Sequence, residues 1–181
     1  MTLPSEPRLP EPYRISSEAC HYDSVPLHGG VHRLRYDFNQ SVETLRVLAV
    51  LSPTCPRCLE GYEMLSRVPE GPNCLVLWTA ILAEDSADVA AEQGRADHHS
   101  SQYWEEEGWP VSTRLRPILG IGPYDPEMSA WDVYLLYPPG SLWTGGNPPS
   151  PTDWTHNLRQ NEPARPRITA ALLDQWASGS T

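Results

Sequence analysis

One stretch constrains the fold of this chain more than any other, because a buried strand, two closely spaced cysteines and a helical pattern follow one another within it. Residues 44–51 are almost continuously apolar and stop at Ser52-Pro53, which is typical of a strand covered on both faces. Cys55-Pro56-Arg57-Cys58 comes next, and apolar side chains then recur at helical spacing as far as Val68. The sequence therefore predicts a helix that begins at or just after Cys55.

The following segment repeats this alternation of strand and helix. Residues 74–82 form a second buried apolar run, and Asp85 or Ser86 can cap a helix that ends near Gly94. Strand, helix, strand and helix at this spacing favour a right-handed parallel βαβ unit. We therefore expect an α/β fold with a central mixed sheet flanked by helices.

The flanking regions carry weaker patterns. Period-two alternation predicts a half-buried strand over 31–38, and helices are possible around 100–107 and 111–119. A β-hairpin is predicted from residues 131–137 and 141–144 around the turn Pro138-Pro139-Gly140, and a helix over 168–176. Prolines at positions 4, 7, 10 and 12 favour an extended arm, so we expect a flexible N-terminal arm over 1–15 and a single domain over 16–181.

The charged residues exclude several classes of function. The chain of 181 residues has 13 arginines, no lysine and a net charge of −10, so amine chemistry such as Schiff-base catalysis is ruled out and nucleic acid is an unfavourable partner. Neither long apolar stretch approaches the ~20 residues of a membrane helix, and the N-terminus lacks the pattern of a secretory signal. We expect a cytoplasmic protein with no membrane partner.

The two cysteines carry the chemistry. At the start of a helix, free N–H groups and the helix dipole favour the thiolate of Cys55, the cation of Arg57 adds to this, and Cys58 lies within reach one turn later. Disulfide exchange needs this arrangement, because one thiolate attacks a disulfide and the second thiol resolves the mixed disulfide. Reduced, inert thiols or a static disulfide are the alternative.

The order strand, Cys-Pro-Arg-Cys, helix, strand, helix, hairpin and helix resembles the thioredoxin-like superfamily over roughly residues 31–178, and within it a group of small bacterial thioredoxin-fold proteins with a similar Trp131-Asp132-Val133-Tyr134 and Trp143 neighbourhood. The resemblance implies that Cys55 is the exposed nucleophile and Cys58 the buried resolving thiol. It also implies that Trp131 and Asp132 lie beside the thiols, and we take Pro56, Arg57, Trp131 and Asp132 as binding residues.

Two positions depart from that family. Thioredoxins carry a cis-proline before the hairpin strand, where this chain has Trp131-Asp132, and a buried acid six residues before the first cysteine, where it has Ala49. If Asp132 faces the dithiol, its carboxylate opposes the thiolate of Cys55. The usual proton acceptor of the resolving thiol is missing.

The other candidate residues favour structural roles. Cys74 begins a buried strand and is expected to pack in the core, and Cys20 lies in a less regular part of the chain. The neighbouring His98 and His99, and His28 and His32 around two glycines, are poor metal pairs. The acidic run 105–107 is expected to be a solvated face.

Three functions remain open. The first is a thiol-disulfide oxidoreductase that cycles Cys55 and Cys58 against a protein or small-molecule disulfide and needs no cofactor. The second is binding or transfer of a soft metal such as copper, zinc or mercury by the same thiolates, helped by Asp132 or a histidine. The third is a non-catalytic thioredoxin-fold binding module.

Overall fold

The computed structural model describes residues 30–67, 72–95, 97, 99–105, 111–120, 130–156 and 167–178. Several expectations fall outside these residues: those for the arm over 1–15 and for Cys20, His28, His98, Glu106 and Glu107. The expected division into an arm and a domain beginning at residue 16 stays a prediction.

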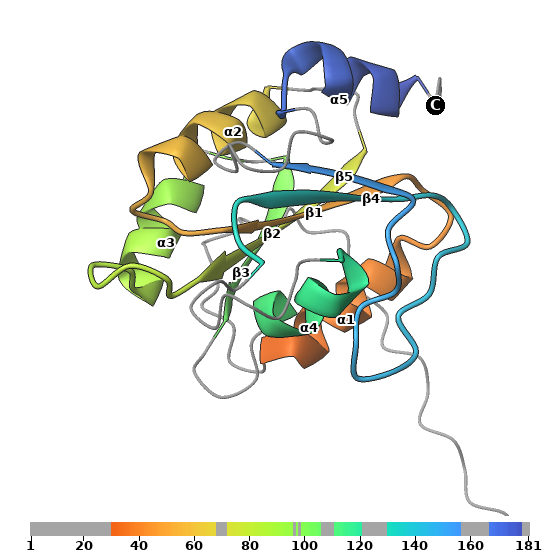
Figure 1. Ribbon diagram of the computed structural model, residues 1–181, viewed down its shortest axis with the longest axis horizontal. Coiled ribbons are helices and arrows are strands. Elements are labelled where there is room, and N and C mark those ends of the chain that lie inside the picture. Colours follow the sequence, from red (N-terminus) through yellow and green to blue (C-terminus); the bar gives the residue numbers. More distant parts are fainter. Residues whose placement is uncertain are drawn as a thin grey trace, which may run out of the picture.

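The described chain forms a five-stranded mixed sheet flanked by helices, as the sequence predicted (Figure 1). The strands are β1 (Arg46–Leu51), β2 (Asn73–Thr79), β3 (Ser100–Glu105), β4 (Val133–Tyr137) and β5 (Asp153–His156), in the order β3-β2-β1-β4-β5. β1, β2 and β3 run parallel, whereas β4 pairs antiparallel with β1, and β5 antiparallel with β4. The predicted parallel βαβ unit is therefore confirmed.

The helices cover the sheet in two layers, which Figure 1 shows above and below it. α2 (Pro56–Ser66), α3 (Ala87–Gly94) and α5 (Ala170–Ala177) pack on one face, and α1 (Gly30–Gln40) and α4 (Val111–Ile118) on the other. β1 alternates between the layers, because Leu48 and Val50 point toward α1 and α4, while Val47, Ala49 and Leu51 point toward α2. β1 is buried along its whole length, as its continuous apolar run predicted.

The strand expected over 31–38 is instead helix α1, and that prediction was wrong. Leu34 and Phe38 are both fully buried, and a spacing of four residues suits a helix face as well as one face of a strand. Tyr36, which period two would also bury, is 56% exposed.

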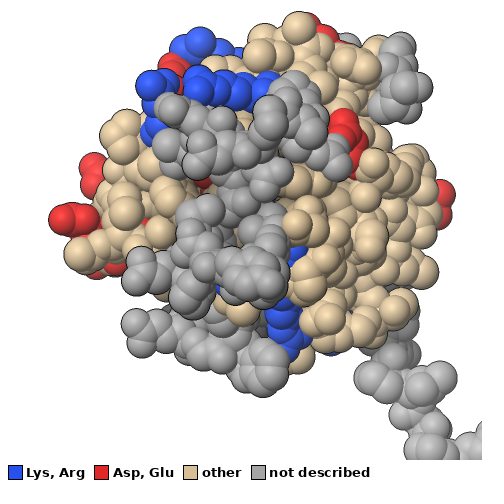
Figure 2. Space-filling model, viewed as in Figure 1, with Lys and Arg blue, Asp and Glu red and all other residues tan. Residues whose placement is uncertain are grey.

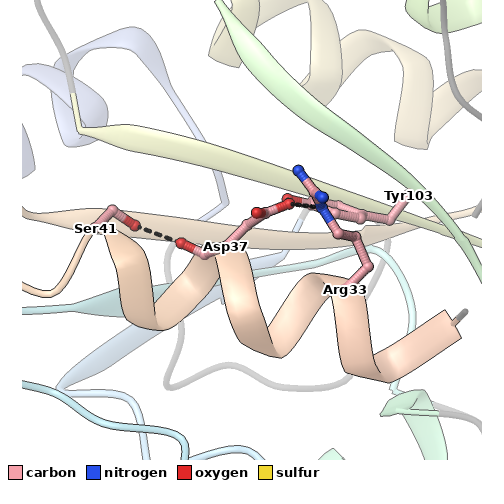
Figure 3. Close-up of polar contacts among 4 residues, drawn as sticks. All are labelled: Arg33, Asp37, Ser41 and Tyr103. Carbon is pink, nitrogen blue, oxygen red and sulfur yellow. Dashed lines mark hydrogen bonds and ion pairs between the residues drawn. The ribbon is translucent and has the colours of Figure 1, made fainter. Parts of the chain in front are cut away.

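Polar contacts attach α1 to the edge of the sheet (Figure 3). The carboxylate of Asp37 accepts a hydrogen bond from the Tyr103 hydroxyl of β3 at 2.8 Å and one from Arg33 at 2.7 Å. The Ser41 hydroxyl donates to the backbone oxygen of Asp37 at 3.0 Å, just past the end of the helix. The contacts of Asp37 with Arg33 and with Ser41 each span four residues, which is the spacing of successive helical turns.

The possible helix around 100–107 was also wrong, because residues 100–105 form the edge strand β3. Tyr103 packs in the core layer of α1 and Trp104 against that of α2, so neighbouring aromatic rings face opposite sides of the sheet. A strand allows this and a helix does not. The expected helices over 86–94, 111–119 and 168–176 are confirmed as α3, α4 and α5.

The hairpin keeps its first strand, β4, but residues 141–144 do not form the second. Trp143 is buried near α1, where its N–H donates to the Asn39 side chain at 2.9 Å and its carbonyl accepts from Asn39 at 3.1 Å. The buried guanidinium of Arg46 donates to three backbone oxygens, those of Phe38, Pro138 and Ser141, at 2.8–3.0 Å. These bonds hold the segment after β4 on α1, so that the strand partner of β4 is β5 instead.

Candidate dithiol site

The loop between β1 and α2 brings Cys55 to the start of the helix. Cys55 is the residue before the first turn, with extended backbone angles of −77° and 116°, and its side chain makes no capping hydrogen bond. Pro56 occupies the first helical turn, where a missing N–H costs nothing. The predicted start of the helix is therefore confirmed.

The carboxylate of Asp85 organises this loop from the neighbouring connection. One oxygen accepts from the Ser52 hydroxyl at 3.0 Å and the Thr54 hydroxyl at 2.6 Å, and the other from the N–H groups of Ile81 and Leu82 at 2.8 Å. Burial opposes the charge, but these hydrogen bonds outweigh it and lower the pKa of Asp85. Sequence reasoning took Asp85 only as a possible helix cap; the cap of α3 is Ser86, whose hydroxyl accepts from the Val89 N–H.

Both thiols of the motif are free and buried, and they differ in access. Cys55 is only 5% exposed and therefore buried, against the expectation of an exposed thiol, and Cys58 is fully buried on the inner side of α2. Burial is the main cause that raises the pKa of Cys58 far above its usual range, and the charge of Asp132 and a hydrogen bond with the Cys55 thiol add to it. A backbone hydrogen bond of Ser52 acts in the opposite direction. Cys58 is therefore a protonated thiol at neutral pH.

Asp132 lies beside this thiol, at the start of β4. Val133 pairs with Val50 in the antiparallel register of β4 and β1. Asp132, one residue before Val133, therefore lies at the end of β1 from which the cysteine loop leaves. The residue is 1% exposed and adopts a left-handed backbone with φ of 55°, which Asp and Asn tolerate better than most residues. Its charge acts on Cys58, whereas the sequence argument placed it against Cys55.

Tyr134, two residues further along β4, joins the same cluster and was not singled out from the sequence. It is fully buried, and its hydroxyl donates to the Cys58 carbonyl at 3.4 Å. Burial, followed by the charges of Asp132, Cys58 and Cys55, raises its pKa well above the ordinary value. An aromatic residue in an apolar strand has no sequence signal that distinguishes it from a core residue.

The remaining expected binding residues, which lie near the two cysteines, differ in how far they are exposed. Pro56 and Arg57 are exposed, and the guanidinium of Arg57 forms an ion pair with Glu60 at 2.8 Å. Trp131 is half-buried and packs against the core cluster that contains both cysteines. The effect of Arg57 on a thiolate stays a prediction.

The other candidates have structural positions. The Cys74 thiol donates to the Pro72 carbonyl at 3.2 Å, and burial raises its pKa to about 12. Glu105 is buried, against the expectation of a solvated acidic face. No group of three or more His, Cys, Asp or Glu side chains able to hold a metal ion occurs among the described residues.

None of the helices in the described part of the chain is both long and apolar enough to cross a membrane. On the face shown in Figure 2, acidic side chains are scattered, and the coloured basic side chains gather in separate places without a continuous basic surface. Comparison with known proteins found no family model, no curated protein and no solved structure that matches the chain.

Proposed function

We propose that this protein is a thiol-disulfide oxidoreductase with a thioredoxin-like fold, in which Cys55 is the nucleophile and Cys58 the resolving thiol. The observation that carries the proposal is the pair of free thiols at the start of α2, of which Cys55 stands just before the first helical turn and Cys58 is the more deeply buried. The first turn of a helix leaves N–H groups without intrahelical partners, and these stabilise a thiolate at that position.

The arrangement suits the two steps of disulfide exchange. The Cys55 thiolate attacks one sulfur of a substrate disulfide, forms a mixed disulfide and releases the first thiolate, which takes up a proton. The Cys58 thiol then loses its proton, and its sulfur attacks the sulfur of Cys55. The products are a Cys55–Cys58 disulfide and a second substrate thiol, so that the dithiol is oxidised and the substrate reduced by two electrons.

The fold supports a thioredoxin-like assignment in one part and departs from it in another. The strand before the motif, the helix after it and the antiparallel strand β4 beside the cysteines fit the resemblance. The first expected strand is replaced by α1, and β3 takes the outer position in the parallel part of the sheet. No cis peptide bond occurs among the described residues.

The experiment compares the wild-type protein with Cys55→Ser and Cys58→Ser, each reduced and then mixed with glutathione disulfide. We expect the wild type to reach the internal disulfide, Cys58→Ser to stop at a mixed disulfide on Cys55, and Cys55→Ser to stay unmodified within the motif. Mass spectrometry after acid quenching identifies each species. A Cys58→Ser protein that forms no adduct on Cys55 would contradict the proposal.

A further inference from the structure

The resolving step of the proposed reaction requires a proton to leave a buried thiol. Cys58 has no solvent exposure, and its environment keeps it protonated at neutral pH. Exposed thiols lose their proton to water or buffer, but at neutral pH a thiol as deeply buried as Cys58 needs an acceptor inside the protein. The acid that could stand on the same face of β1 is absent, because position 49 is an alanine in the layer of Cys58.

The described acidic residues around the motif differ in what they contact. The Asp85 carboxylate is occupied by the Ser52 and Thr54 hydroxyls and two backbone N–H groups. Glu60 is exposed and pairs with Arg57. Asp97 accepts from the Tyr62 hydroxyl at 2.8 Å, close to the far end of α2. None of the three is among the charges that act on Cys58.

Asp132 meets the requirement by position. The residue is buried and lies at the end of β4 that faces the cysteine loop, between Trp131 and Val133. Trp131 packs against the cluster that holds both cysteines, and Tyr134 contacts the backbone of Cys58 itself. Two neighbours of Asp132 on the chain therefore fix it beside the resolving cysteine.

We propose that Asp132 is the proton acceptor of the resolving thiol Cys58, a role that rests on the function proposed above. In the mixed-disulfide state the Asp132 carboxylate takes the proton from Cys58, whose sulfur attacks Cys55 and expels the second substrate thiolate. That thiolate takes up a proton from the Asp132 carboxylic acid or from water, and the carboxylate is restored. No further oxidant is needed, because the substrate disulfide accepts both electrons.

The proposal predicts that removing the Asp132 carboxylate slows the resolving step, whereas removing a carboxylate that acts only as a fixed charge would speed it. As a fixed negative charge, Asp132 disfavours the Cys58 thiolate, so its removal would speed the resolving step. As a proton acceptor, its removal slows that step, on the order of 100-fold at pH 7. Asp132→Asn separates these alternatives and keeps a side chain that tolerates the left-handed backbone.

The experiment follows the mixed disulfide after rapid mixing of reduced protein with glutathione disulfide, at pH 6, 7 and 9. In Asp132→Asn we expect the attack by Cys55 to be no slower than in the wild type, and the mixed disulfide to accumulate at pH 6 and 7. At pH 9, hydroxide replaces the missing acceptor and the difference narrows. A purely structural role would slow both steps and would not give this pH profile.

Glu84→Gln is the matched control, since it removes one exposed carboxylate near the same end of the sheet and should behave as the wild type. Should the asparagine variant not fold, Asp132→Gly also suits the positive φ and removes the carboxylate. Resolution as fast as in the wild type, or faster, would overturn the role of Asp132. A wild-type protein that forms no mixed disulfide would overturn the proposed function itself, before any variant is compared.

Discussion

The hydroxyl group of Tyr134 occupies the space that a side chain at Gly61 would need. A Cβ atom built on Gly61 would stand 2.8 Å from the Tyr134 ring carbon Cζ, and closer still to its oxygen. The ring belongs to a fully buried residue of β4, and Gly61 lies one turn beyond Cys58 on the inner side of α2. The absence of a side chain at position 61 therefore allows α2 to pack closely on the sheet at the dithiol.

Gly61→Ala is expected to destabilise the protein, although alanine is the better helix former. The gain in helix propensity is about 1 kcal/mol, whereas overpacking a core contact costs about 1–3 kcal/mol. Urea unfolding measures the difference. Gly61→Ala combined with Tyr134→Phe removes the clashing hydroxyl and should recover part of the loss. If the single variant is more stable than the wild type, the contact between these residues is not close.

Alkylation should modify Cys55 before Cys58 and Cys74. Cys58 is fully buried, burial raises the pKa of both Cys58 and Cys74, and the Cys74 thiol donates to a backbone carbonyl. Iodoacetamide at neutral pH followed by tryptic mapping measures this order, because cleavage after Arg57 separates the two motif cysteines. Cys74→Ser should keep the same order. Earlier labelling of Cys58 would reverse the assignment of the nucleophile.

Glu105 should make stability depend on pH. Its carboxyl group accepts hydrogen bonds from the Thr79 hydroxyl at 2.8 Å and the Ser112 hydroxyl at 3.3 Å, and from the Val111 N–H at the start of α4. Burial nevertheless raises its pKa from 4.5 to about 7. The folded state then binds a proton more tightly than the unfolded state, so this contribution is full below pH 4.5 and is lost as the pH rises through 7.

Glu105→Gln removes that titration. Between pH 4.5 and 8, the free energy of unfolding of the wild type should fall relative to the variant by about 3 kcal/mol, from the 1.36 kcal/mol that each pKa unit represents. Urea denaturation of both proteins across this range provides the measurement. If the free energy of unfolding changes with pH in the same way for the two proteins, Glu105 has the same pKa in the folded and unfolded states.

The attachment of α1 should depend on Tyr103 rather than on Arg33. Tyr103 is buried, and its hydroxyl contacts Asp37 across the helix and strand, whereas the Arg33 side chain is 60% exposed. Tyr103→Phe is expected to cost about 1.5–3 kcal/mol, because it removes a hydrogen bond to a charged acceptor. Arg33→Ala should cost below about 0.5 kcal/mol. Thermal unfolding compares the two variants, and equal losses would contradict this order.

The sequence predicted secondary structure correctly where a continuous apolar run is ended by residues typical of a turn or a helix start. The continuous apolar runs of β1 and β2 leave little choice but central strands, and Ser52-Pro53 with Cys55-Pro56 marks the change to a helix. By contrast, the spacing of Leu34 and Phe38 fits both a strand and a helix, and only the exposure of Tyr36 in the structure distinguishes the helix from the strand. Residues 141–144 follow a turn signal typical of a hairpin, but tertiary contacts with Asn39 hold Trp143 on α1.

In the candidate site too, some residues could be predicted from the sequence and others could not. Cys55 and Cys58 could be singled out because their spacing and their place after a strand are local features. The contacts of Asp85, Asp132 and Tyr134 depend on how the loops and β4 meet β1, which no local pattern specifies. For Asp132, the resemblance indicated the region, and the structure identified Cys58 as the thiol on which its charge acts.

The central claim is that Cys55 and Cys58 form a reversible redox pair. The most direct measurement is an equilibrium titration of the wild-type protein in glutathione buffers of graded potential, with the internal disulfide quantified by mass mapping, in metal-free and in zinc- or copper-loaded protein. We expect a single reversible two-electron transition, in the range of exchange-active dithiols at roughly −120 to −270 mV, in metal-free protein and also after incubation with zinc or copper. A pair that stays reduced or oxidised throughout, or one that titrates in metal-free protein but not in metal-loaded protein, would contradict the account.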